Sequence, residues 1–305
     1  MTRFGKLAVT TVAATLVLIA FGGFVRAMEA GLGCPDWPTC HGALNPPSKL
    51  AWGDLKLAWI EHSHRLWAAV LIVLIVLLAA EAWVSRQPRR VRLVTLWLVP
   101  AVLSQAVLGA IVVWLKLDAA SVVLHLSGAI VVLGLAIHVA LQQARPAVVR
   151  PRLGSLPAAT LAVTIGQMLL GSAVTGWSAG LAYGTFPSFN GNVLPPAVQN
   201  AQQVLHVAHR LTAYVVVGLV AALWWRARQS EPLVARFATV ALALTAVQVT
   251  LGALNIWYRL PAWSVAPHLA VGSWIVASLY VVVFRASSRA EPEAGNGIAW
   301  AAVAA

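Results

Sequence analysis

Eight long apolar blocks limit what this chain can fold into more than any other feature of its sequence. A helix of about 20 apolar residues crosses the hydrocarbon core of a bilayer and satisfies its own backbone hydrogen bonds there. Only 10% of the 305 residues are charged, against about a quarter in a soluble domain. We therefore expect an all-α integral membrane protein with eight transmembrane helices, over Leu7–Ala27, Trp59–Val84, Leu93–Leu115, Ser121–Leu141, Leu156–Trp177, Val204–Trp225, Val234–Trp257 and Val265–Phe284.

The basic residues alternate between loops in the way that a membrane topology requires. The chain has 21 Lys and Arg and a formal net charge of +12. With the N-terminus inside, the inner segments hold fourteen of them: Arg3, Lys6, Arg86, Arg89, Arg90, Arg92, Arg145, Arg150, Arg152, Arg226, Arg228, Arg236, Arg285 and Arg289. Cytoplasmic loops carry such an excess. The distribution predicts a multi-pass protein of the cell inner membrane, with both termini cytoplasmic. Its expected partner is membrane lipid and not nucleic acid.

The two cysteines of the chain, Cys34 and Cys40, both fall in the first outer loop of this topology. The space outside a bacterial inner membrane, or its organellar equivalent, is oxidising, and disulfides persist in such compartments. A disulfide or a redox-active pair is therefore expected, with two free thiols as the alternative. Whether a disulfide here is structural or redox-active stays open.

The chain contains an internal repeat, so that residues 1–150 and 151–305 resemble each other. The matched segments include His64-Arg65-Leu66 with His209-Arg210-Leu211, and Gln105…His125 with Gln248…His268. Each half holds four spans, an even number, so both halves enter the membrane from the same side. We expect two tandem four-helix bundles related by a parallel pseudo-twofold axis along the membrane normal. The stretch from Gln143 to Leu156 is the expected link between them.

Four of the eight histidines occupy matched repeat positions, within a turn or two of the outer ends of the even-numbered spans: His64, His125, His209 and His268. Ionisable residues inside a membrane are costly and are functional candidates. Each half presents two histidines at similar depth, as two axial imidazoles around one haem iron require. Zinc or copper would need further ligands, and no Cys or carboxylate set is present in both halves. We therefore predict two haems near the outer face, each bound at its iron by one pair.

The halves differ one turn before the first histidine, where Glu61 stands in the first half and His206 in the second. A carboxylate at this position can act as acid or base at a haem edge, or serve as a hydrogen-bonding partner or a helix N-terminal charge. Arg65 and Arg210 are candidates to bind haem propionates, with interfacial anchoring as the alternative. His138, which has no counterpart in the second half, is interpreted as structural, and the role of His206 stays open.

These residues resemble the haem A synthase family of bacterial and mitochondrial membranes over nearly the whole chain. The most specific segments are residues 31–42 of the first outer loop, Glu61-x-x-His64-Arg65 and the two Gln-x-x-Leu-Gly-Ala…His patterns. The resemblance implies an enzyme that oxidises a pyrrole methyl group of haem O to a formyl group, giving haem A for cytochrome oxidase. It implies haem O as substrate between His64 and His125, haem B as cofactor between His209 and His268, and Glu61 as the catalytic residue.

The same resemblance implies a Cys34–Cys40 disulfide and haem O synthase as a partner. Some relatives have a second cysteine pair in the third outer loop, but residues 178–203 hold none here, so a role that needs two disulfides does not carry over. A dihaem b-type cytochrome is an alternative that leaves the one-sided Glu61 unexplained. A transporter or haem chaperone is another, but no charged residue marks a path at the midplane. The electron acceptor, the oxygen source and the oligomeric state, with a homo-oligomer among the forms considered, stay open.

Overall fold

The computed structural model describes residues 2–142 and 153–287, most of which lie in eight α-helices. The helices are α1 (Arg3–Ala27), α2 (Trp52–Val84), α3 (Arg89–Trp114), α4 (Ala119–Leu141), α5 (Leu156–Gly176), α6 (Ala201–Ala227), α7 (Pro232–Trp257) and α8 (Ala262–Ser287). Each is long and apolar enough to cross a membrane. The described residues contain no β-strand, only two isolated β-bridges in loops. The predicted all-α fold with eight membrane-spanning helices is confirmed.

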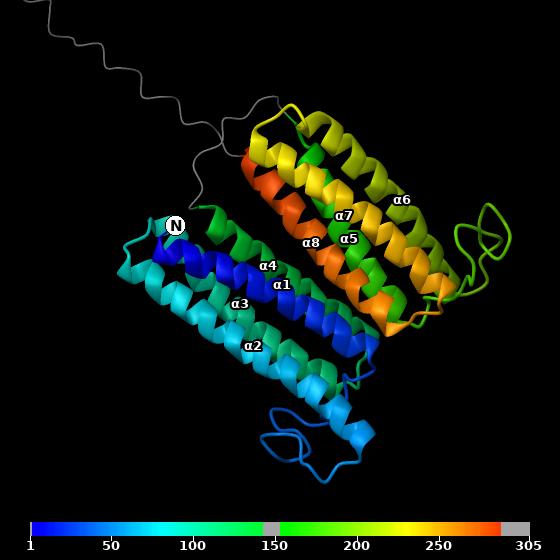
Figure 1. Cartoon of the computed structure of the whole chain (residues 1–305), viewed down its shortest axis with the longest axis horizontal. Coiled ribbons are helices and arrows are strands. Elements are labelled where there is room, and N and C mark those ends of the chain that lie inside the picture. The colour runs from blue at the N-terminus through cyan, green and yellow to red at the C-terminus, as the bar shows by residue number, and fades with distance from the viewer. Residues whose placement is uncertain (1, 143–152, 288–305) are drawn as a thin grey trace, which may run out of the picture.

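The helices form two four-helix bundles that lie side by side (Figure 1). In the first bundle α1 packs against α2, α2 against α3, α3 against α4 and α4 against α1, and α5 to α8 form the same ring. Diagonal helices do not touch, so α2 faces α4 across the first bundle and α6 faces α8 across the second. Between bundles, α1 packs against α8, α5 against α4, and α4 against α8. The pseudo-twofold axis stays a prediction, and the predicted boundary at residues 150 and 151 lies outside the described residues.

The largest clusters of buried apolar residues fill the half of each bundle that lies away from the histidines. In the first bundle the cluster joins the start of α1 to the end of α2, as Phe4 packs with Leu71, Ile75 and Leu78. In the second bundle the end of α6 and the start of α7 make the equivalent core. Close packing of this kind holds helices together in lipid, where apolar surface gains little from burial. The four histidines lie outside these clusters.

Two long loops, residues 28–51 and 177–200, cap the same end of the two bundles (Figure 1). Their backbones match. Each has a cis proline bond, Trp37–Pro38 or Phe186–Pro187, followed by a β-bridge, Cys40 with Ala43 or Phe189 with Asn192. The repeat therefore extends beyond the spans into the loops, at one constant offset of 149 residues.

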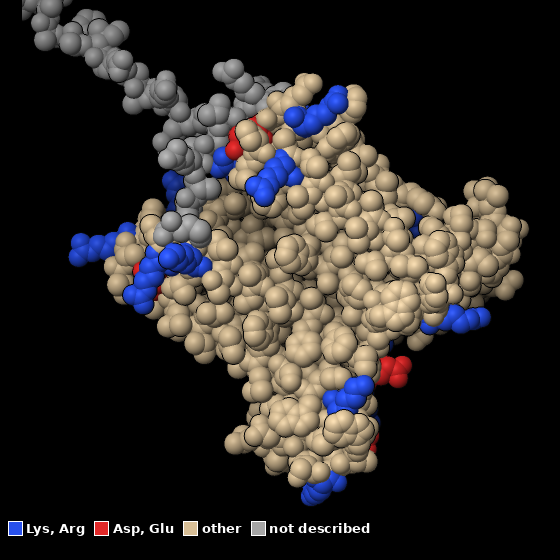
Figure 2. Space-filling model, viewed as in Figure 1, with Lys and Arg blue, Asp and Glu red and all other residues tan. Residues whose placement is uncertain are grey.

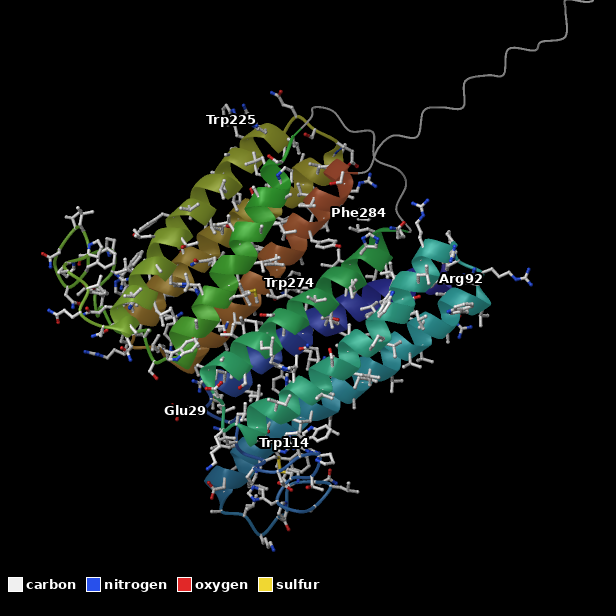
Figure 3. The ribbon with its side chains drawn as sticks, turned by 180° about the vertical axis from the view of Figure 1, so that it is seen from behind. Glu29, Arg92, Trp114, Trp225, Trp274 and Phe284 are labelled. Carbon is white, nitrogen blue, oxygen red and sulfur yellow. A yellow bond between two sulfur atoms is a disulfide. The ribbon has the colours of Figure 1, made fainter. Side chains whose placement is uncertain are left out.

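Many Lys and Arg side chains gather at the end opposite these loops, and a broad belt without charged side chains separates the two ends in Figure 2. Figure 3 shows Arg92, Trp225 and Phe284 at the basic end, with Glu29 and Trp114 near the loops. The chain is thus a multi-pass membrane protein. The inner membrane and the cytoplasmic position of the basic end stay predictions, and the C-terminal residues 288–305 lie outside the described residues.

The helix that carries His64 begins earlier than its apolar block predicts. α2 starts at Trp52 rather than Trp59, and α6 and α8 each start three residues earlier than predicted. Asp54 and Lys56 lower the hydropathy of this segment without preventing a helix, and an acidic residue in the first turn stabilises one. As a result His64 lies 12 residues after the first residue of its helix, further from the helix start than the predicted turn or two.

Candidate functional site: two histidine pairs and their loops

The four histidines at the repeat positions lie on the diagonal helices of the two bundles. His64 on α2 and His125 on α4 lie near each other across the first bundle. His209 on α6 and His268 on α8 show the same relation in the second bundle. All four residues are half-buried. Each bundle therefore holds one pair of imidazoles on opposite helices, which is the arrangement that two axial ligands of one iron require.

Each of these imidazole rings rests on a glycine of the neighbouring helix. A Cβ atom built on the glycine would lie 3.0 to 3.4 Å from the ring Cε1 atom; the pairs are Gly22 with His64, Gly109 with His125, Gly171 with His209 and Gly252 with His268. The four glycines occupy matched positions of the repeat. A larger residue would push the ring away from its helix, so these positions need glycine for close approach.

The nitrogen atoms of these rings have few protein partners. Nδ1 of His64, His125 and His268 is buried without a hydrogen-bond partner. Since Nδ1 is buried and Cε1 lies on glycine, the Nε2–Cδ2 edge of each half-buried ring is left to face the accessible space. Among the residues that the structure describes, no cluster of three or more His, Cys, Asp or Glu could hold a metal ion. The donor set fits a haem, whose macrocycle supplies the other ligands of the iron.

The repeated glutamines Gln105 and Gln248 lie one turn before two of these glycines, and their side chains reach the neighbouring helix. A Cβ atom on Gly128 of α4 would lie 1.9 Å from Gln105 Nε2, and one on Gly272 of α8 would lie 3.5 Å from Gln248 Nε2. The Oε1 atom of both glutamines is buried without a hydrogen-bond partner. The repeated Gln-x-x-Leu-Gly-Ala pattern thus marks side chains that line the histidine sites.

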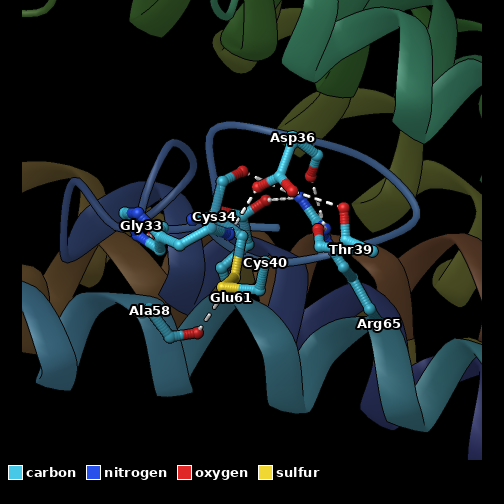
Figure 4. A network of polar contacts seen from close by, with 9 residues as sticks. Gly33, Cys34, Asp36, Thr39, Cys40, Ala58, Glu61 and Arg65 are labelled. Atoms are coloured by element: carbon cyan, nitrogen blue, oxygen red, sulfur yellow. Dashed lines mark hydrogen bonds and ion pairs between the residues drawn. A yellow bond between two sulfur atoms is a disulfide. The ribbon is translucent and has the colours of Figure 1, made fainter. Parts of the chain in front are cut away.

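Glu61 and Arg65 fasten the first long loop, residues 28–51, to α2 (Figure 4). Glu61 is 4% exposed, and its Oε2 atom accepts a hydrogen bond from the Cys34 N–H at 2.7 Å. Its Oε1 atom lies 2.6 Å from Arg65 Nη2 in an ion pair. Arg65 also donates to the carbonyl oxygens of Cys34, Asp36 and Thr39 at 2.8 to 2.9 Å. The pair therefore holds the loop above the first histidine site.

The loop itself is closed by the Cys34–Cys40 disulfide, which confirms that prediction. Inside it the Asp36 carboxylate accepts hydrogen bonds from the Thr39 hydroxyl and from the N–H groups of His41 and Gly42. Burial acts to raise the pKa of Asp36, but these hydrogen bonds outweigh it and lower the pKa to about 2. Asp36 is therefore ionised near neutral pH, and its carboxylate holds the loop by these hydrogen bonds.

The second loop is fastened in the same way by different residues. His206 Nε2 accepts a hydrogen bond from Arg210 Nε at 2.9 Å, and its Nδ1 lies 3.3 Å from the Tyr183 backbone nitrogen. Since a neutral imidazole accepts at only one of its nitrogens, the shorter contact, with Arg210, is the hydrogen bond. Arg210 also donates to the carbonyl oxygens of Tyr183 and Ser188 at 3.0 Å. At the repeat offset, Tyr183 and Phe189 replace the two cysteines, and their rings meet edge to face 5.2 Å apart. An aromatic contact therefore closes this loop where a disulfide closes the first.

The contacts of Glu61 with Arg65 and of His206 with Arg210 bear on the roles that the sequence predicted for these residues. Arg65 and Arg210 bind loop carbonyl oxygens here, so a contact with haem propionates stays a prediction for both. His206 takes the place of Glu61 between its loop and the arginine of its helix. The His138 ring lies 5.2 Å from the Phe284 ring, and its Nε2 lies 3.0 Å from Gln142 Nε2. Its structural role stays an interpretation.

Gln167 is the site residue that the sequence interpretation missed. Its side chain Nε2 lies 3.1 Å from His209 Nδ1. The repeat contained a signal, since Gln167 is an amide inside an apolar block at a position where the first half has Leu18.

Comparison with known proteins finds one family model over most of the chain. The model, COX15-CtaA, is described as cytochrome oxidase assembly protein and matches residues 5–280. Curated relatives include "Heme A synthase" of Symbiobacterium thermophilum, 33% identical over 79% of this chain and 82% of the relative. "Heme A synthase" of Shewanella oneidensis is 27% identical over 89% and 93%, and that of Paracoccus denitrificans is 27% identical over 90% and 84%.

Proposed function

Since the chain belongs to the COX15-CtaA family of cytochrome oxidase assembly proteins, we propose that it is a haem A synthase, which oxidises the pyrrole methyl group of haem O to a formyl group. The observation that carries the proposal is a pair of histidines in each bundle whose rings lie against glycines of the neighbouring helices. A carboxylate stands one turn from the first histidine in one bundle only. One site thus has a carboxylate where the other has the imidazole of His206. Relatives covering most of the chain bear the name of this enzyme.

The conversion of a methyl to a formyl group removes electrons and protons and adds one oxygen atom. Written with water as the oxygen source, it is –CH3 + H2O → –CHO + 4 H+ + 4 e−. His64 and His125 would hold haem O as the substrate in the first bundle. His209 and His268 would hold a haem B, which supplies one-electron redox chemistry to carry electrons to an acceptor outside the chain.

Glu61 is the residue to which we assign the role of proton acceptor in the first bundle. It lies one helical turn from His64, on the same side of α2. Both of its oxygens are engaged, one by the Cys34 N–H and one by Arg65. A proton accepted by Glu61 therefore weakens the ion pair with Arg65, which couples proton removal to the hold on the loop.

Co-expression with haem O synthase tests the proposal. Membranes that contain the unsubstituted chain should yield haem A on extraction, and Glu61→Gln should reduce its formation by roughly 10²–10⁴-fold, the usual effect of losing a general base. Glutamine keeps an acceptor for the Cys34 N–H, so the loop is disturbed less than by alanine. Glu29→Gln, at an exposed carboxylate of the same end, is the matched control and should leave haem A formation unchanged.

Recovery of haem B alone, with reversible reduction by quinol, would contradict the proposal and favour the electron-carrier alternative. His209→Ala separately tests the cofactor assignment, because it should abolish the low-spin haem B spectrum. An unchanged spectrum would refute it.

The setting of the reaction belongs to the same proposal. We place the chain in the inner membrane with its histidine sites toward the outer face, because the basic ends of the helices lie at the opposite end (Figure 2). Haem O synthase is the expected partner, since its product is the substrate. Co-purification of the two proteins from one membrane tests this.

A further inference from the structure

Gln167 makes the second histidine pair different from the first. Its amide Nε2 atom lies 3.1 Å from His209 Nδ1 and donates to the His209 carbonyl oxygen at 2.9 Å. The amide therefore holds both the ring and the backbone of one residue. Gln167 also lies one turn before Gly171 on α5, so the amide and the glycine meet the same ring from one side of one helix.

The first pair has no equivalent group. Leu18 stands at the position of Gln167, while Gly22 stands at that of Gly171. His64 rests on Gly22, and its other ring contact is the edge of Phe21, with ring centroids 5.9 Å apart. Its Nδ1 atom is buried without a hydrogen-bond partner. Since the last torsion of a histidine side chain is broad and weakly restricted, apolar contacts leave the His64 ring more rotational freedom than His209 has.

The Gln167 amide suits a ring that binds a metal. A histidine that binds metal through one ring nitrogen donates from the other to an acceptor of the protein. An amide has a donor at one end and an acceptor at the other, so it can serve either tautomer of the ring. Gln167 Oε1 is buried without a hydrogen-bond partner. A half-turn of the amide presents this oxygen to Nδ1, so Oε1 can accept a hydrogen bond from Nδ1–H when Nε2 binds iron. In that orientation the hydrogen bond to the His209 carbonyl oxygen is given up.

We propose that Gln167 is a positioning residue that fixes the His209 ring for a permanently bound haem, whereas the unanchored His64 ring suits a haem that enters and leaves. This inference rests on the proposed function. It explains by one difference in the repeat why two similar bundles would treat their haems differently: a substrate must exchange, and a cofactor must stay.

The test follows haem in the second bundle alone. The full chain carrying His64→Ala and His125→Ala is loaded with haem B, and transfer of that haem to excess apomyoglobin is timed. Gln167→Leu, which reproduces the first-half residue, should speed transfer by roughly 10–100-fold, the usual effect of removing the partner of a metal-bound histidine. Gln202→Leu, at an exposed glutamine of α6, is the matched control and should leave the rate unchanged.

The reduction potential separates positioning from a merely structural role. Gln167→Leu should raise the potential of this haem, because Nδ1–H loses its acceptor and the imidazole becomes a weaker donor to iron. Gln167→Glu should lower it, since a carboxylate is a stronger acceptor, while transfer stays slow. Opposite shifts from two substitutions at one position are not expected from a loss of packing.

Unchanged transfer rates and potentials in both Gln167 variants, with normal melting of the protein, would overturn the inference and leave the haem A synthase proposal standing. Failure of the doubly substituted parent to bind haem through His209 and His268 would overturn both. The reciprocal Leu18→Gln variant, studied with His209→Ala and His268→Ala, should slow haem loss from the first bundle. Faster or equal loss there would also count against the inference.

Discussion

Replacing Arg65 by methionine tests whether one guanidinium holds the first long loop, residues 28–51. Methionine keeps an unbranched apolar stem but removes the hydrogen bonds to the carbonyl oxygens of Cys34, Asp36 and Thr39 and to the Glu61 carboxylate. The Glu61 carboxylate then stays buried with the Cys34 N–H as its remaining partner in this network.

The size of the effect follows from burial. The Arg65 and Glu61 side chains are 15% and 5% exposed, and removing one partner of a buried ion pair costs about 3–5 kcal/mol. At about 1.4 kcal/mol per factor of ten, this corresponds to an opening equilibrium raised roughly 10²–10⁴-fold. The Cys34–Cys40 disulfide still closes the loop on itself, so the lower end of this range is expected.

Hydrogen–deuterium exchange with mass spectrometry measures the opening on the detergent-solubilised protein. Peptides from residues 33–43 should lose about 100-fold in protection, while residues 182–192 of the second loop should not change. Arg210→Met is the matched control and should give the reverse pattern. Adding Glu61→Gln to Arg65→Met should restore part of the protection, because the unpaired buried charge is gone. First-loop exchange within about threefold of the parent in Arg65→Met would show that the guanidinium does not hold the loop.

Two further predictions concern the glycines that contact the histidine rings and the response of the first long loop to acid. Gly171→Ala places a Cβ atom 3.0 Å from His209 Cε1. It should weaken haem binding in the second bundle by roughly 10-fold, the lower end of the effect of disturbing a metal ligand, as measured by haem titration. The control is Gly218→Ala, where a Cβ atom meets nothing within 4 Å, and it should bind haem as the parent does. Because the pKa of Asp36 is lowered to about 2, its carboxylate stabilises the first loop fully above its ordinary pKa, and this stabilisation is lost as the pH falls toward 2. The parent loop should become more susceptible to pepsin as the pH falls from 5 to 2, whereas the susceptibility of the Asp36→Asn loop should not change with pH. A parent loop whose susceptibility does not change with pH would contradict the role of the Asp36 carboxylate.

The position of each histidine pair was predictable because the repeat is strong. Matched spacing in two halves separates four histidines from the other four, and an even number of spans puts them at one end. The role of Arg65 was less predictable, because its partners lie in a loop 26 to 31 residues earlier in the chain. No local pattern reveals which carbonyl oxygens a loop will turn toward a helix.

The sequence by itself determined the eight spans, the two halves and the candidate iron ligands. Hydropathy acts over single helices and repeats act by spacing, so both can be read along the chain. Only the tertiary structure decided that Glu61 and Arg65 clamp a loop, that glycines seat the imidazole rings, and that Gln167 holds His209 while His64 has no such partner. These contacts depend on how helices from distant parts of the chain are rotated against each other, and that rotation is set by packing across the whole bundle.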